Sequence, residues 1–277
     1  MQNNSSNSIV FVTGAFVSST CWNEWKAYFQ SQGYTCYAPA HPHKEGIAAA
    51  LRSEHPHSSI AHNSLTSVVE FYAAFIRRLP EKPILIGHSF GGLILQLLLQ
   101  QNLGTAGVAI HSVPPQGVLT LKWSFFRSVT PALGLFTSQK KTYLMSFKHW
   151  QYTFTNGLDL ATQRATYEQF VVPESKRMSR GALTQEAQIN FARPHAPLLF
   201  VAGSTDHIMP ASLNYSNYQR YAKHKGSITE FKEFAGRNHF VLGLPTWRES
   251  ADFVLSWLSY TIGAPAPVRA RTAEPQR

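Results

Sequence analysis

The sequence predicts an α/β fold in which a mostly parallel β-sheet is covered by helices on both faces. Short apolar runs alternate along the chain with longer segments whose apolar residues recur at helical spacing. This alternation is typical of parallel sheets, because each parallel strand needs a crossover connection, usually a helix. The 277 residues are 44% hydrophobic, a composition that suits one large packed domain, with or without an insertion.

The first part of the chain supplies four expected strands and three expected helices. Gly33 follows the first helix and can take the left-handed conformation that ends a helix, and Pro39 and Pro80 close the second strand and second helix. We expect the strands at residues 9–12, 35–38, 83–86 and 107–110, and the helices at residues 22–29, 65–79 and 93–99.

The alternation of strands and helices stops between residues 114 and 193 and then resumes. Two further strands are expected at residues 197–202 and 228–234, and a closing helix at residues 247–258. We therefore expect a core built from residues 9–113 and 194–262, interrupted by an insertion at 114–193. Polar residues 1–8 and the Ala-, Pro- and Arg-rich tail 263–277 are expected to be disordered.

The net charge of +10 raises the question of nucleic-acid binding, and its distribution answers it. Residues 117–193 carry ten basic and four acidic residues, whereas the flanking core segments are each close to neutral. The chain has no run of five like charges and no nucleic-acid-binding signature. We therefore expect no nucleic-acid partner.

Cysteine content and the N-terminal residues bear on the compartment. Only Cys21 and Cys36 are present, so the chain cannot build a disulfide framework or a CxxC metal site. The apolar stretch 9–12 is too short for a signal sequence or a membrane span. We expect a cytoplasmic protein without a membrane span, and the oligomeric state stays open.

A candidate nucleophile lies between the strand at 83–86 and the following helix. Gly87-His88-Ser89-Phe90-Gly91 matches the GxSxG nucleophile elbow, in which a sharp strand-to-helix turn presents the serine hydroxyl. Glycines are needed on both sides because side chains would clash in so tight a bend. The alternative is a glycine-rich turn in which Ser89 has a purely structural role.

The acid and the base of a triad are expected after the nucleophile, in that order. Asp206 follows the strand at 197–202 and is the candidate acid, with a helix-capping role as the alternative. His239 lies between the last strand and the last helix and is the candidate base. His207 adjoins the acid and His224 lies in a basic helical stretch, so neither is favoured, and His88 is expected to be a packed, hydrogen-bonded histidine.

The oxyanion hole is expected to use the backbone N–H groups of Ala15 and Phe90. The first strand ends in Thr13-Gly14-Ala15-Phe16, where a glycine lets the backbone turn toward the serine. Such a donor contributes about 3 kcal/mol to transition-state stabilisation. The Phe16 N–H is the competing donor, and an ordinary turn at the end of the strand is the alternative.

These motifs, taken in order, resemble those of the α/β-hydrolase superfamily over residues 9–260. They are VTGAF at the end of the first strand, GHSFGG as the elbow, GSTDHIMP as the acid loop and GRNHF as the histidine loop. Thr13 stands where many members have histidine. The resemblance implies a core of about eight strands, with a mainly helical cap inserted after the sixth, here residues 114–193. A serine nucleophile disfavours the dehalogenase and epoxide hydrolase branches.

The insertion also supplies candidates for a substrate pocket. Residues 117–154 contain nine aromatic side chains, which either line an apolar pocket or pack the insertion against the core. The candidate pocket residues are Phe16, Trp123, Phe126, Phe147 and Trp150. The basic excess of the same segment either steers anionic substrates or forms a solvated outer face.

Five histidines lie within 22 residues, at positions 41, 43, 55, 57 and 62, and the first four form two His-Pro-His stretches. Imidazoles at i and i+2 can share a metal ion, but no carboxylate or cysteine completes an obvious ligand set. We expect no metal and no cofactor, and place these loops in solvent or at the rim of the active site.

The sequence thus predicts a serine hydrolase that cleaves an ester, lactone or thioester of a small, largely apolar substrate through an acyl-enzyme intermediate. A carbon–carbon bond hydrolase or lyase on the same triad remains open, as does a non-catalytic ligand receptor.

Overall fold

The structure, a computed structural model, describes residues 6–221, 223, 226–263 and 265. Its main sheet has six strands among these residues, all parallel, in the order β2-β1-β3-β4-β7-β8. The strands are β1 (Ser8–Val12), β2 (Thr35–Tyr37), β3 (Ile84–His88), β4 (Ala106–Ile110), β7 (Leu198–Gly203) and β8 (Thr229–Phe234).

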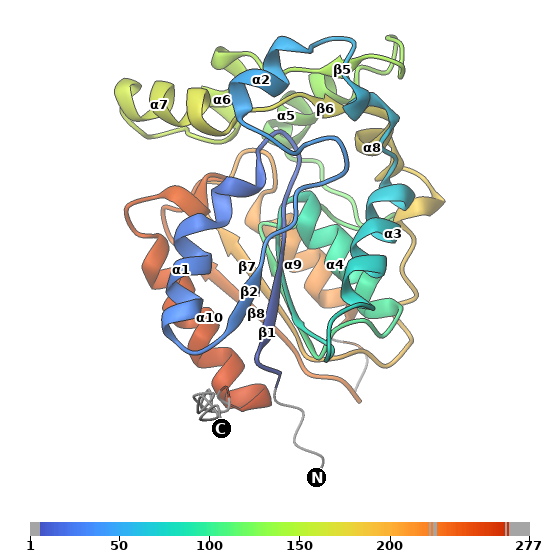
Figure 1. The fold of residues 1–277 in the computed structure, drawn as a ribbon, viewed down its shortest axis with the longest axis vertical. Helices are drawn as coiled ribbons and strands as arrows, with labels where there is room; N and C mark the ends of the chain where they lie inside the picture. The colour runs from blue at the N-terminus through green and yellow to red at the C-terminus, as the bar shows by residue number, and fades with distance from the viewer. Residues whose placement is uncertain (1–5, 222, 224–225, 264, 266–277) are drawn as a thin grey trace, which may run out of the picture.

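Helices cover both faces of the sheet, as the alternation predicts (Figure 1). One face packs against α1 (Asn23–Ser31) and α10 (Trp247–Ile262), and the other against α3 (Leu65–Ile76), α4 (Phe90–Gln100) and α9 (Ala211–Tyr221). Successive side chains of β1 point to opposite faces, so Ile9 and Phe11 join one apolar core while Val10 and Val12 join the other. Because both faces are buried, the central strands read as unbroken apolar runs.

The six strands among the described residues are those that the apolar runs of the sequence predict, and they are fewer than the roughly eight that the family resemblance implies. The insertion correspondingly follows the fourth strand of the sheet, β4, and not a sixth. The structure also contains α9, for which the sequence predicts no range, although the capping alternative for Asp206 implies a helix there. Its apolar residues are sparse between many polar ones, so the helical period was weak.

Most of residues 114–193, hereafter the cap, lie across the carboxyl ends of the strands (Figure 1), and the last of them run back beside the helix α4, where the Asn190 N–H donates to Gln100 at its C-terminal end. They form helices around a two-stranded antiparallel sheet: α5 (Trp123–Leu133), β5 (Thr142–Tyr143), α6 (Phe147–Thr153), α7 (Leu160–Phe170), β6 (Glu174–Ser175) and α8 (Lys176–Gly181), followed by a 3-10 turn, η3 (Gln185–Ala187). A second segment, from outside residues 114–193, also packs against the cap. It consists of α2 (Ala48–Ser53) and the 3-10 turn η2 (Ser59–His62). Arg52 of α2 donates to the backbone oxygens of Glu168 and Val171.

Two further expectations concern the ends of the chain and the membrane. Strand β1 begins at Ser8, and the buried Ser6 hydroxyl donates to Glu81, so the described part of segment 1–8 is packed against the core. Residues 1–5 and most of the tail 263–277 lie outside the described residues. Among the described helices, none combines the length and apolar character needed to cross a bilayer.

Candidate active site

Ser89 lies between β3 and α4 in a backbone conformation that L-residues rarely adopt, with φ 57° and ψ −119°. The neighbouring glycines make this turn possible. A Cβ atom on Gly87 would lie 2.2 Å from the Gly91 carbonyl oxygen, and one on Gly91 would lie 1.9 Å from the Val12 carbonyl oxygen. The strand-to-helix turn therefore requires glycine at both positions, as the motif predicts.

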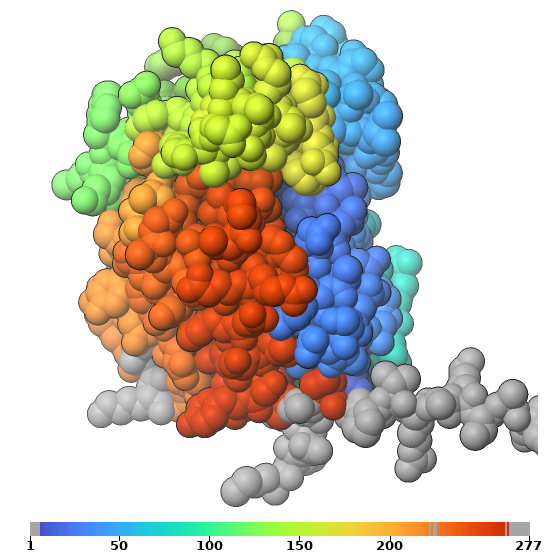
Figure 2. Space-filling model, turned by 90° about the vertical axis from the view of Figure 1, so that its left-hand side faces the viewer, coloured from blue at the N-terminus to red at the C-terminus, as the bar shows by residue number. Residues whose placement is uncertain are grey.

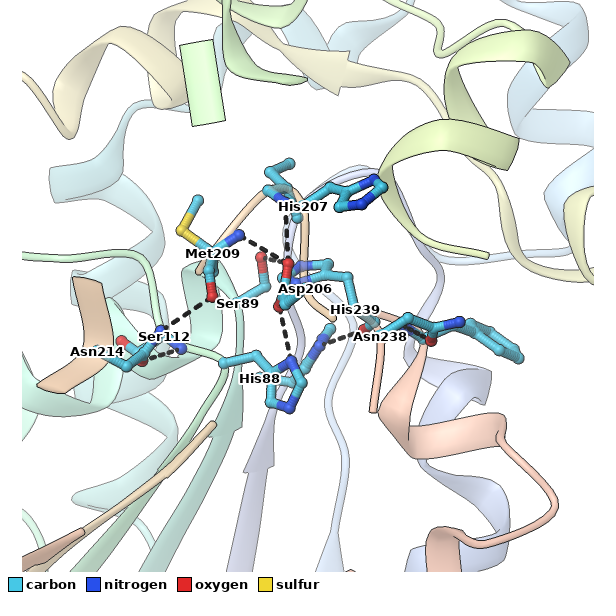
Figure 3. Close-up of polar contacts among 12 residues, drawn as sticks. His88, Ser89, Ser112, Asp206, His207, Met209, Asn214, Asn238 and His239 are labelled. Atoms are coloured by element: carbon cyan, nitrogen blue, oxygen red, sulfur yellow. Dashed lines mark hydrogen bonds and ion pairs between the residues drawn. The ribbon is translucent and has the colours of Figure 1, made fainter. Parts of the chain in front are cut away.

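Three side chains from distant parts of the chain form a hydrogen-bonded series at the carboxyl edge of the sheet (Figure 3). The Ser89 Oγ lies 3.0 Å from His239 Nε2, and His239 Nδ1 lies 2.6 Å from Asp206 Oδ2. Asp206 follows β7 and His239 follows β8, so each residue comes from a loop at the end of a neighbouring parallel strand. Since Nδ1 donates to the carboxylate, Nε2 presents a lone pair to the serine hydroxyl.

Asp206 is buried and its carboxylate accepts four hydrogen bonds. Oδ1 accepts the backbone N–H groups of Ile208 and Met209 at 2.9 and 2.7 Å, and Oδ2 accepts both His239 and His111. Burial alone would raise the pKa of this carboxyl, but electrostatic attraction by His239 and the hydrogen bonds from both imidazoles outweigh it and hold the pKa well below its usual range. Asp206 is therefore a fixed negative charge.

His111 is the functional neighbour that sequence reasoning missed. It follows β4 directly, is fully buried, and donates from Nδ1 to Asp206 Oδ2 at 2.6 Å. Burial lowers its pKa, so the imidazole is neutral. The available signal was its position: it is the first residue after a parallel strand, and the ends of such strands share one edge.

His88 and His207 have structural contacts, and neither enters the series. His88 is buried and its Nε2 donates to the backbone oxygen of His239 at 2.9 Å, as expected for a packed histidine. His207 Nδ1 donates to the backbone oxygen of Tyr152. His224 lies outside the described residues.

His111, Asp206 and His239 also form the one group of potential metal ligands among the described residues. Their geometry does not fit an ion. Both Nδ1 atoms already lie 2.6 Å from one carboxylate oxygen, a hydrogen-bond distance that leaves no room for a cation between them.

The loop after β1 passes directly beside Ser89. A Cβ atom on Gly14 would lie 2.8 Å from the His88 carbonyl oxygen and 2.9 Å from Ser89 Cβ. Among the described residues, the Ala15 N–H has no hydrogen-bond partner, and Phe90 is the first residue of α4, whose N–H has none within the helix. The Phe16 N–H, the competing donor, is bonded at 3.2 Å to Glu174 Oε2.

Buried polar groups hold the loop after β1 in place. This loop contains Thr13, at a position where many family members have histidine. The Thr13 N–H donates to the Tyr72 hydroxyl, and His41 Nε2 donates to the Thr13 carbonyl oxygen at 3.0 Å. Glu174 of the cap is fully buried with Lys44 as its ion-pair partner. The first His-Pro-His stretch therefore holds the loop through His41, which is buried rather than in solvent, and Lys44 directly after this stretch pairs with Glu174. In the second stretch, His55 Nδ1 lies 2.8 Å from Thr142 Oγ1 of the cap.

An apolar cavity of about 630 Å³ opens onto Ser89. Its lining comes from Phe16, Phe90, residues 113–121, helix α5, α8 with Ala182 and Leu183 beyond it, and residues 208–209, and it includes no charged side chain. The basic residues of the cap therefore do not line the cavity.

Only two of the five candidate pocket residues, Phe16 and Phe126, line this cavity. The other three require correction. Trp123 is 75% exposed, Phe147 packs on Tyr167, and the fully buried Trp150 stacks on Phe154 with ring centroids 4.4 Å apart. Aromatic content in the sequence could not separate side chains that fill the cap from those that line a cavity.

The model of the Alpha/beta hydrolase family matches residues 9–254 of this chain, whereas no curated protein matches it by sequence. Monoacylglycerol lipase from Paleococcus ferrophilus has a similar structure, with TM-score 0.67 and 20% identity over 92% of this chain and 94% of its own. A pyrethroid hydrolase from Sphingobium faniae gives TM-score 0.62 at 17% identity, covering 90% and 96%. Tomato methylketone synthase I gives 0.63 at 15%, covering 92% and 98%. At these identities the likeness shows the fold alone.

Proposed function

The chain belongs to the alpha/beta hydrolase family, and from this premise we propose that it is a serine hydrolase acting on a carboxylic ester of a largely apolar substrate. The observation that carries the proposal is the series from Ser89 Oγ through His239 to the ionised Asp206, at a strained turn that faces an apolar cavity. Lactones and thioesters present the same carbonyl to the nucleophile and belong to the same proposal.

In the proposed reaction, Ser89 Oγ attacks the substrate carbonyl carbon while His239 Nε2 takes the hydroxyl proton. Asp206 keeps the imidazole in the tautomer that can accept this proton and stabilises the imidazolium. The negative charge that develops on the carbonyl oxygen is met by the N–H groups of Ala15 and Phe90, at about 3 kcal/mol for each donor.

The second half of the proposed reaction releases the product and restores the enzyme. His239 returns its proton to the leaving alkoxide, which leaves an acyl group on Ser89. His239 then accepts a proton from water, whose oxygen attacks the acyl carbon, and the carboxylic acid departs as Ser89 regains its proton.

The cavity supports an apolar substrate over a charged one. No charged side chain lines it, so a substrate carboxylate or ammonium inside it would lose its hydration without gaining an ion pair. Two structural neighbours are named as a monoacylglycerol lipase and a pyrethroid hydrolase, so the same fold carries hydrolases in both.

The proposal is tested by labelling with a fluorophosphonate probe and by turnover of p-nitrophenyl esters. We expect stoichiometric labelling that Ser89→Ala abolishes and that Ser212→Ala, at an exposed serine of α9, leaves intact. Ester turnover should fall by at least about 10³-fold in His239→Ala, because the proton acceptor is lost. His207→Ala, which removes a neighbouring histidine outside the series, is the matched control.

Absence of labelling in the folded wild-type protein would refute the nucleophile. Labelling without turnover of any ester, lactone or thioester would instead refute the substrate class and favour carbon–carbon bond cleavage on the same residues.

A further inference from the structure

The cap exposes an unusual number of large apolar side chains close to the cavity opening. Leu121 is 94% exposed and Trp123 is 75% exposed, although soluble domains normally scatter such residues singly. The set, which we call the apolar rim, consists of Leu119, Leu121, Trp123, Phe126, Leu135, Phe136 and Leu183.

The apolar rim is continuous with the cavity that opens onto Ser89. Five of its seven members also line that cavity, namely Leu119, Leu121, Phe126, Leu135 and Leu183. These side chains therefore contact both the cavity and the solvent outside it. Figure 2 shows the green segment around residues 120–140 as an overhang at the upper edge of the molecule.

The charge around the apolar rim points to what covers it. Residues 117–154 include no aspartate or glutamate, but five basic residues: Lys122, Arg127, Lys140, Lys141 and Lys148. All five are exposed, and in the described part of the chain no ion pair involves them. Arg127 lies over the Tyr152 ring at 4.0 Å, so its charge stays on the surface.

Exposed Trp, Phe and Leu side chains interspersed with lysines are typical of segments that lie in the interface of an anionic bilayer. The rings and aliphatic chains enter the headgroup–acyl boundary, while the ammonium groups remain among the lipid phosphates. A second copy of this chain fits less well, because pairing two apolar rims would bring the five uncompensated cations of each copy together.

We propose that the apolar rim docks the protein onto an anionic lipid surface, so that the cavity opening faces the lipid. Leu121, Trp123 and Phe136 insert, and Lys122, Lys140 and Lys141 contact the headgroups. Docking is a property of the surface of the cap and does not depend on the proposed hydrolase function.

The test measures partitioning onto vesicles by co-sedimentation, using the Ser89→Ala protein so that no lipid is consumed. We expect binding to phosphatidylcholine vesicles that contain 30% phosphatidylserine and weaker binding to pure phosphatidylcholine. The Trp123→Ser/Phe136→Ser variant should bind at least tenfold more weakly, because its apolar insertion is lost. Tyr260→Ser, which removes an aromatic that is 88% exposed on α10, should bind as the parent protein does.

Two lysine variants test the electrostatic contribution to vesicle binding. Lys122→Gln should weaken binding to the anionic vesicles about fivefold, whereas Lys82→Gln, at an exposed lysine before β3, should leave it unchanged. These exposed substitutions are expected to preserve folding, which circular dichroism verifies.

Two results would overturn docking: equal binding by the parent protein and the Trp123→Ser/Phe136→Ser variant, or no binding to either vesicle type. A dimer of the parent protein that the same double substitution dissociates would show that a second copy covers the rim instead. Failure of the hydrolase proposal would leave vesicle binding unchanged, so the two failures are distinguishable.

Discussion

The strained backbone of Ser89 leads to a quantitative prediction about stability. At φ 57° and ψ −119° the Cβ atom is held in a region where an L-residue costs about 1–3 kcal/mol relative to a relaxed conformation. Glycine has no Cβ atom and adopts this conformation without the strain. Comparing Ser89→Gly with Ser89→Ala isolates the effect, because both substitutions remove the hydroxyl and leave His239 Nε2 equally unpaired.

The magnitude follows from a matched substitution at an unstrained position. Ala73 is 2% exposed inside helix α3, and Ala73→Gly should lower the free energy of unfolding by about 1.5–2 kcal/mol through lost methyl burial and added chain entropy. The same losses separate the two Ser89 variants, but relief of strain opposes them. Replacing alanine by glycine should therefore lower the free energy of unfolding less at position 89 than at position 73. We expect the difference between the two losses to be about 1–3 kcal/mol, where the loss at position 89 is that from Ser89→Ala to Ser89→Gly.

Urea unfolding at pH 8, analysed by linear extrapolation with a common m-value, provides the four free energies. The reasoning is refuted if glycine for alanine costs as much at position 89 as at position 73. Such a result would mean that the turn stores no measurable strain and that the surrounding sheet does not force it.

Two predictions concern the buried histidines. In His111→Leu, the Asp206 carboxylate loses one of its two imidazole donors and is held less firmly, so kcat/KM for p-nitrophenyl esters should fall by about tenfold; an unchanged kcat/KM in a folded variant would count against this contact. Burial lowers the pKa of His41 to about 3 and also lowers the pKa values of His88 and His111. The unfolded chain therefore binds protons below pH 6.5 that the folded chain does not, and the free energy of unfolding should fall between pH 6.5 and 5.5, by about 1 kcal/mol through His41 and further through His88 and His111. Urea titrations at the two pH values measure the loss, which His41→Gln should reduce by about 1 kcal/mol and the exposed His43→Gln should not; an equal loss in all three proteins would contradict the assignment.

Some features of the candidate site could be predicted because their causes are local. The elbow needs glycine at 87 and 91, since a Cβ atom at either position would collide with the backbone. Both glycines lie within five consecutive residues, so the motif can be recognised from the sequence. Asp206 and His239 could be proposed because parallel strands end at one edge of the sheet, so the residues just after them are brought together.

Other features depend on contacts between segments that the sequence does not connect. Glu174, 158 positions away in the sequence, accepts a hydrogen bond from the Phe16 N–H, and this leaves Ala15 as the unpartnered donor of the loop. Neither the spacing nor the composition of the cap indicates that a glutamate there would be buried beside Lys44. The choice between the two donors therefore needed the packed structure.

The sequence by itself determined the six strands, their alternation with helices and the order of the loops that carry the candidate nucleophile, acid and base. Apolar periodicity and turn chemistry are properties of neighbouring residues, and they survive in any correct fold of this chain. Only the tertiary structure decided that His111 shares the Asp206 carboxylate, and which cap side chains line the cavity, fill the cap or stay exposed. Those outcomes depend on how side chains from distant segments compete for the same space and the same hydrogen-bonding groups, and local pattern carries no record of that competition.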